Sequence, residues 1–189
     1  MRLDAISLRI DSPVGASLPG RGFYQADEER LLVQVGQFSK ARHFFSYLES
    51  DHVRFDIDRN GRLMLIEVDL PRRQWPVADH LPLPTIADRA DVHWLDFRAG
   101  IPNPELLADQ SRSHLLLRFA ESQSWRWYQI AEAVLIQVDA ADHLTAVMVT
   151  RIEDDLAGRR IAAFRKALRG STAGQSSRGP SPKSGRPAL

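Results

Sequence analysis

Residues 53–68 alternate between apolar and polar side chains on both sides of a short polar link, and this pattern constrains the fold strongly. Before the link, the apolar positions are Val53, Phe55 and Ile57. Successive side chains of a strand point to opposite faces, so these three share one face. The link Asp58-Arg59-Asn60-Gly61 supplies a carboxylate that can accept backbone N–H bonds and a glycine that tolerates positive φ. The stretch therefore predicts a β-hairpin closed by a tight turn.

The same stretch also matches the ligand pattern of a calcium-binding EF-hand loop. The pattern places oxygen ligands at positions one, three, five and twelve with a glycine at six. The residues at the four ligand positions are Asp56, Asp58, Asn60 and Glu67. An EF-hand continues into a helix, whereas residues 63–68 have a strand pattern and Pro71 follows closely. We therefore favour the hairpin and predict no metal site, with these four residues kept as the alternative metal ligands.

A weaker copy of this pattern returns later in the chain. A displacement of 81 residues places Val53 on Val134 and Asp58 on Asp139, and a slightly larger one places residues 31–35 on residues 115–119. An aromatic segment precedes the hairpin in both copies, as expected of a duplicated unit. The second copy has Gln137 and Met148 at the positions of Asp56 and Glu67, so a shared fold would not depend on the metal ligands.

These patterns predict a mainly β (α+β) fold made of two similar antiparallel β-modules and closed by a C-terminal α-helix. The first module occupies residues 1–70, a Pro-rich connector residues 71–90, the second module with its helix residues 91–170, and a disordered basic tail residues 171–189. The sequence leaves open whether the modules pack face to face as a sandwich or share one continuous sheet.

The closing helix is predicted over residues 153–169. Acidic side chains open this segment, basic side chains end it, and Gly170 follows as a stop, as the helix dipole and the usual C-terminal signals favour. An apolar stripe that could cover a sheet consists of Leu156, Ile161, Phe164 and Leu168.

The composition is that of an ordinary globular protein, with 43% hydrophobic and 26% charged residues among 189. A chain of this length can bury a core without a disulfide or a structural metal. It contains no cysteine, which excludes disulfides, thiolate chemistry and cysteine-ligated zinc. The N-terminus has no apolar signal-peptide run, and no segment approaches a membrane span. We therefore expect a soluble cytoplasmic protein that does not associate with membranes.

The net charge of +1 hides an uneven distribution. All 24 acidic residues lie at or before Asp155, whereas eight of the 25 basic residues lie at or after Arg159. The basic end could remain solvated, fold back on the acidic body or bind an anionic partner. Nucleic acid is disfavoured, because the sequence has no recognisable nucleic-acid motif and the acidic body would repel a phosphate backbone.

No catalytic motif is present in the sequence. The six histidines lack metal-ligand spacing, and there is no P-loop, G-x-S-x-G or G-x-G-x-x-G motif. The four tryptophans could form a ligand-stacking surface, although aromatic residues of a β-rich protein more often belong to the core.

We therefore predict no catalytic residues and no cofactor, and expect a non-enzymatic binding or interaction protein. Its partner would be another protein or a second copy of the chain, since exposed edge strands would permit a homodimer. The alternative is a divalent-metal-dependent enzyme or calcium-responsive module that uses residues 56–67.

Residues 24–68 carry a family resemblance. Tyr24, Asp27, Leu31 and Val33, followed by the Asp-x-Asp-x-x-Gly-x-Leu-x-x-Ile-Glu run from Asp56, resemble a small bacterial β-rich domain family of unknown function. The resemblance covers about a quarter of the chain and implies a compact β-module with no assigned activity. The second copy lacks the glycine and the glutamate of this run.

Overall fold

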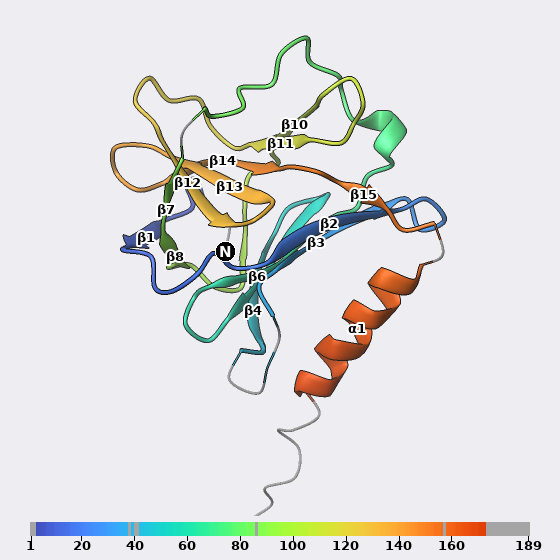
Figure 1. The fold of residues 1–189 in the computed structure, drawn as a ribbon. Helices are drawn as coiled ribbons and strands as arrows, with labels where there is room; N and C mark the ends of the chain where they lie inside the picture. Colours follow the sequence, from blue (N-terminus) through green and yellow to red (C-terminus); the bar gives the residue numbers. More distant parts are fainter. Residues whose placement is uncertain (1–2, 38, 40–41, 86, 157, 173–189) are drawn as a thin grey trace, which may run out of the picture.

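The computed structural model of the chain describes residues 3–37, 39, 42–85, 87–156 and 158–172. Two large β-sheets face each other, and one α-helix lies outside them (Figure 1). In spatial order, the seven-stranded sheet consists of β15 (Glu153–Asp154), β2 (Gly20–Gln25), β3 (Arg30–Val35), β6 (Leu63–Val68), β5 (Val53–Asp58), β4 (Phe44–Glu49) and β9 (Ala99–Gly100). The six-stranded sheet consists of β10 (Glu105–Ala108), β11 (Leu115–Arg118), β14 (Leu144–Val149), β13 (Val134–Val138), β12 (Arg126–Ala131) and β7 (Asp88–Arg89). The remaining elements are the antiparallel pair β1 (Leu8–Asp11) and β8 (Asp91–Trp94), the 3-10 turn η1 (Arg72–Gln74) and the helix α1 (Arg159–Thr172).

The predicted hairpin is confirmed as β5 and β6, and the two modules share its geometry. The strand order β2-β3-β6-β5-β4 in the first module corresponds to β10-β11-β14-β13-β12 in the second. Val53 pairs with Val68 in the first hairpin, and Val134 pairs with Val149 in the second. The register also shifts at the same point, between Asp56 and Ile57 and again 81 residues later. Strand order, register and bulge therefore agree with the displacement found in the sequence.

Short segments from elsewhere in the chain cover the edges of both sheets. In the seven-stranded sheet, β15 pairs with β2 and β9 pairs with β4, both in parallel. In the six-stranded sheet, β7 pairs with β12, and Val77 forms a parallel bridge with Ala108 of β10. Each of these segments pairs with only one or two residues of its edge strand, so the edges are covered in part. A homodimer and a protein partner both stay predictions.

The question of sandwich or continuous sheet is resolved by the core. The inner faces of the two separate sheets contribute to one buried apolar cluster, to which β1 and β8 also belong. Fully buried members include Leu31, Phe55 and Ile66 from the first module and Leu117 and Ile136 from the second. The modules therefore pack face to face, as in a β-sandwich.

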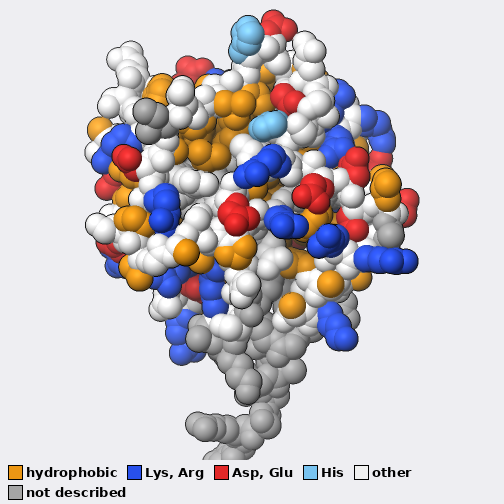
Figure 2. All heavy atoms as spheres, in the orientation of Figure 1, with side chains coloured by type: hydrophobic (Ala, Val, Ile, Leu, Met, Phe, Trp, Pro, Cys, Tyr) orange, Lys and Arg blue, Asp and Glu red, His pale blue; other side chains and the backbone are white. Residues whose placement is uncertain are grey.

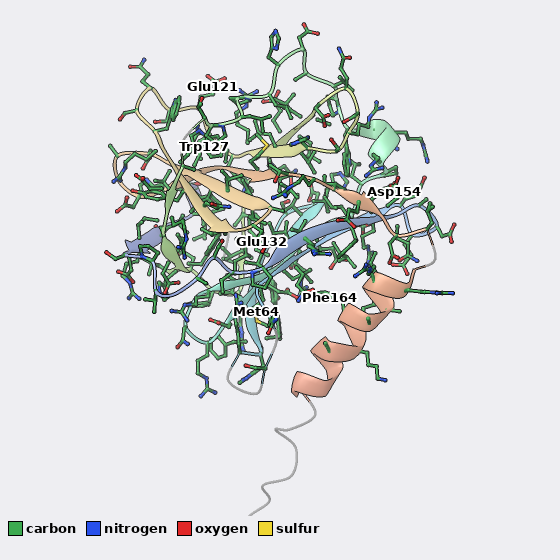
Figure 3. The ribbon with its side chains drawn as sticks, viewed as in Figure 1. Met64, Glu121, Trp127, Glu132, Asp154 and Phe164 are labelled. Carbon is green, nitrogen blue, oxygen red and sulfur yellow. The ribbon has the colours of Figure 1, made fainter. Side chains whose placement is uncertain are left out.

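Each outer face is covered by the segment that follows the other module. Helix α1 follows β14 and places Ile161 and Phe164 on the seven-stranded sheet, where Phe164 lies between helix and strands (Figure 3). The connector follows β6 and places Leu81 on the six-stranded sheet, against a cluster that contains Leu116 and Trp127. In the space-filling view, apolar side chains gather in the upper part of the face shown, and charges of both signs alternate below (Figure 2).

The predicted helix boundaries are wrong at both ends. Glu153 and Asp154 form β15, and α1 begins only at Arg159 and continues through Gly170 to Thr172. Asp155 is buried and accepts hydrogen bonds from the amides of Arg160 (3.3 Å) and Ile161 (2.8 Å), so its carboxylate caps the helix.

Leu156 precedes the helix and is 89% exposed, so it does not belong to the covering stripe. The tail was predicted to begin at residue 171, but residues 171 and 172 belong to α1. The side chain of Leu168 and residues 173–189 of the predicted tail lie outside the described residues.

Within the described part of the basic end, Arg160 and Arg165 contact the body. The Arg165 guanidinium forms two hydrogen bonds with the Glu28 carboxylate, one of them 2.7 Å long, and Arg160 lies over the ring of Phe23 at 5.9 Å. This ion pair lowers the pKa of Glu28. No helix among the described residues is long and apolar enough to cross a membrane.

Candidate ligand-binding site

The four candidate metal ligands do not converge on one point. Asp56 and Glu67 lie in a groove on the outer face of the seven-stranded sheet, beside α1. Asp56 pairs with Arg54 (2.8 Å), and Glu67 pairs with Arg30 (2.7 Å). Asp58 instead closes the hairpin turn. Within the described part of the chain, no cluster of three histidine, aspartate or glutamate side chains could hold a metal ion.

Burial raises the pKa of Asp56 and of Glu67, and the arginine beside each carboxylate offsets part of that rise. The groove measures about 410 Å³ and is lined by charges of both signs. Because both carboxylates are already paired with guanidinium groups, their arrangement is that of an ion-pair network on a sheet face.

The hairpin turn that contains the other two candidate metal ligands, Asp58 and Asn60, is fixed by contacts with Arg42 and His93. Asp58 accepts hydrogen bonds from the amides of Asn60 (2.8 Å) and Arg62 (2.9 Å), and its second oxygen lies 3.4 Å from Nε of Arg42. Nδ1 of His93 donates to the carbonyl oxygen of Asn60 (2.6 Å). Burial lowers the pKa of Arg42, and the Asp58 charge opposes that shift. Asp58 and Asn60 thus connect the hairpin to Arg42 and to β8.

A cavity of about 170 Å³ lies beside this turn, between the two modules. Its walls come from both sheets, from β8 and from residues 13–18. The apolar wall is formed by Pro13, Val14, Ala16, Leu18, Val35, Leu63, Ala90, Val92, Trp94 and Ile130, and the polar wall by Ser17, Arg42, Arg62, Arg89, Asp91 and Gln129. The cavity therefore combines a large apolar surface with three guanidinium groups, a combination common in sites for small ligands.

The three arginines differ in how their charges are compensated. Arg62 forms a two-pronged pair with Asp91, with Nε and Oδ1 3.0 Å apart. Arg42 is held by Asp58 and by the carbonyl oxygen of Leu63. Arg89 donates to the carbonyl oxygen of Gly15 (2.7 Å), and no described carboxylate lies within ion-pair distance of it. Arg89 therefore contributes the uncompensated positive charge of the wall.

Trp94 and Gly36 complete the site. Trp94 is 1% exposed and lines the cavity, and its indole N–H has no hydrogen-bond partner among the described residues. A buried donor without an acceptor is rare and costs about 1–3 kcal/mol. Gly36 has φ +73°, and a Cβ there would lie only 1.7 Å from Nη1 of Arg42. Glycine at this position leaves the space that the Arg42 side chain occupies.

The corresponding place in the second module is nearly filled. A cavity of about 70 Å³ lies there, and Phe119 and His143 stand at the positions of Val35 and Arg62. The Phe119 ring packs on Phe55 with 5.8 Å between centroids. The same fold can thus close this space, so the larger cavity is a feature of these residues and not of the architecture.

Comparison with known proteins gives no relative from which a function could be transferred: no protein-family model matches the chain, and no curated protein is significantly similar to it. The resemblance of residues 24–68 stays a prediction.

Sequence patterns did not single out the arginines of this site. Arg42, Arg62, Arg89 and Trp94 come from four segments, and only the packing of the modules brings them together. The one usable signal was a mismatch between the copies, since Val35 aligns with Phe119. Of the four tryptophans that we considered for stacking, Trp94 alone lines the cavity, and Trp125 is 52% exposed.

Proposed function

We propose that this chain is a non-enzymatic binding protein and that its ligand occupies the cavity between the two modules. The single observation that supports this most strongly is the asymmetry of the duplicated fold. One copy keeps about 170 Å³ open beside arginines, whereas the other leaves about 70 Å³ beside Phe119. Apolar surface left open to solvent forgoes the stabilisation of burial, so an open cavity kept in one copy favours a use for it.

The chemistry of the wall supports binding without catalysis. Among its residues, only Ser17 and Asp91 could act as a nucleophile or a general base. Asp91 is held in its pair with Arg62. A hydroxyl with no base within reach is a weak nucleophile.

The volume sets the size of the ligand. An engineered cavity of about 150 Å³ in another protein binds benzene. A cavity of about 170 Å³ therefore suits the buried part of a ligand with roughly six to ten non-hydrogen atoms.

Ligand-observed NMR with a panel of small ring compounds tests this proposal. The unmodified protein should give saturable binding to at least one compound. Val35→Phe, which copies Phe119 of the second module, should abolish it. Leu18→Trp should weaken it, because Leu18 is 37% exposed on the cavity wall and a larger ring there narrows the space.

Leu83→Trp is the matched control, because Leu83 is 50% exposed on the connector and does not line the cavity. Thermal melts confirm that each variant is folded. Binding that survives both Val35→Phe and Leu18→Trp, or no binding to any compound, would overturn the proposal.

A further inference from the structure

We infer that the ligand is a small monocarboxylate, with an apolar body inside the cavity and its carboxylate on Arg89. This inference rests on the proposed function and adds the chemical class of the ligand. Two observations carry it: the charge of the wall and the chemistry of the interior.

The charge of the wall favours a ligand with one negative charge. Arg62 is neutralised by Asp91, and Arg42 by Asp58, whereas Arg89 has no carboxylate partner among the residues that the structure describes. A dianionic phosphate group would need a second unpaired cation. A single carboxylate balances the one charge that is left.

The geometry of Arg89 favours a carboxylate over a halide or a neutral carbonyl. Its side chain is exposed at the end of β7, and only its Nη2 hydrogen bond to Gly15 is in use. The guanidinium group is planar and presents parallel N–H donors, which match the two oxygens of a carboxylate. Arg89 can therefore take a carboxylate at the cavity and keep its bond to the 13–18 segment.

The interior sets the rest of the ligand. Val35, Leu63, Val92 and Ile130 present only hydrocarbon, so the buried body is apolar.

The test compares phenylacetate with phenylacetamide, which has nearly the same shape but no charge. Titration calorimetry should show phenylacetate binding about tenfold to a hundredfold more tightly, as expected for replacing neutral hydrogen bonds with charge-assisted ones. Arg89→Gln should remove this preference, so that the ratio of the two affinities falls to about one. Arg21→Gln, at an exposed arginine outside the cavity, is the matched control and should keep the preference.

The outcomes distinguish a failure of the carboxylate inference from a failure of the proposed binding function. Equal affinity of the unmodified protein for both compounds would overturn the carboxylate inference and leave the cavity as a binding site. A preference that survives Arg89→Gln would show that the carboxylate lies elsewhere, which also overturns the inference. If neither compound binds and no other member of the ring panel does, the proposed function itself fails.

Discussion

The two hairpin turns offer a direct test of how burial changes the value of one carboxylate. Asp58 and Asp139 occupy equivalent positions, and each accepts hydrogen bonds from two backbone amides of its turn at 2.8 and 2.9 Å. Their surroundings differ. The Asp58 side chain is 4% exposed and lies beside the buried Arg42, whereas the Asp139 side chain is 28% exposed and contacts His143.

These contacts give different costs for replacement by alanine. Asp139→Ala removes two amide hydrogen bonds that water can partly replace, and we expect a loss of about 1–2 kcal/mol of unfolding free energy. Asp58→Ala removes equivalent bonds and also leaves Arg42 as a buried charge without its counter-ion, so we expect about 3–5 kcal/mol. For a chain of this size, the difference corresponds to a gap of roughly 5–10 °C between the melting temperatures.

Urea unfolding of the two variants measures the difference, with similar slopes required for the comparison. The double variant Arg42→Met with Asp58→Ala should recover at least about 1 kcal/mol relative to Asp58→Ala alone, since it removes the isolated charge. Equal losses for Asp58→Ala and Asp139→Ala, or no recovery in the double variant, would show that the burial of Arg42 does not set the cost.

Three further predictions concern other parts of the molecule. Burial raises the pKa of Asp56 and Glu67, so the folded protein holds these protons more tightly than the unfolded chain, and the stability they confer at low pH is lost as the pH rises through the folded pKa. Asp56→Asn with Glu67→Gln removes this loss. The unfolding free energy at pH 7 minus that at pH 3 should therefore be larger in the double variant than in the unmodified protein, and an equal value in both would contradict this. Gly61→Ala should lower the unfolding free energy by about 1–3 kcal/mol, because Gly61 has φ +79° and a Cβ there would lie 2.5 Å from a backbone oxygen of β8. Asp142→Gly, at the equivalent position of the second module, should change the unfolding free energy by less than about 1 kcal/mol. Ending the chain after Thr172 should leave the melting temperature unchanged. Neither the full chain nor the shortened one should be retained on nucleic acid at low salt, and salt-sensitive retention of the full chain alone would contradict this.

Alternation and duplication were the parts of the fold that the sequence could predict. Both rest on local patterns, since a period of two specifies a half-buried strand and its recurrence specifies a second unit. The strand β2 carries no alternation signal, because Gly20 and Gly22 interrupt its sequence. In the structure, a Cβ on Gly20 would lie 2.7 Å from the Cβ of Ala131, and one on Gly22 would lie 3.2 Å from Val149. These glycines allow the two modules to approach closely, a requirement that local sequence does not show.

The start of the helix was mispredicted for a related reason. The run from Glu153 to Asp155 has the charge expected of a first helical turn. Pairing with β2 takes Glu153 and Asp154 into a sheet, and Asp155 becomes the cap of a helix that starts later. Tertiary pairing thus overrode a local preference.

The candidate site could not be predicted because it depends on contacts between distant segments. The calcium-loop pattern indicated residues 56–67 as the candidate site. In the structure, Asp56 and Glu67 pair with arginines and Asp58 stabilises a turn. The cavity, in contrast, depends on Val35 where Phe119 could have stood, and on an arginine from the connector. Neither residue carries a motif.

The indole N–H resonance of Trp94 reports on whether a ligand occupies the cavity that this side chain lines. It can be followed in nitrogen–proton correlation spectra of the full chain during titration with phenylacetate and the ring panel, and assigned with single Trp→Phe variants. The proposed site predicts a saturable shift of the Trp94 resonance with the same dissociation constant as calorimetry, and no shift for the exposed Trp125. Binding that shifts Trp125 and leaves Trp94 unchanged, or no shift of Trp94 with any compound, would contradict the assignment of this cavity as the ligand site.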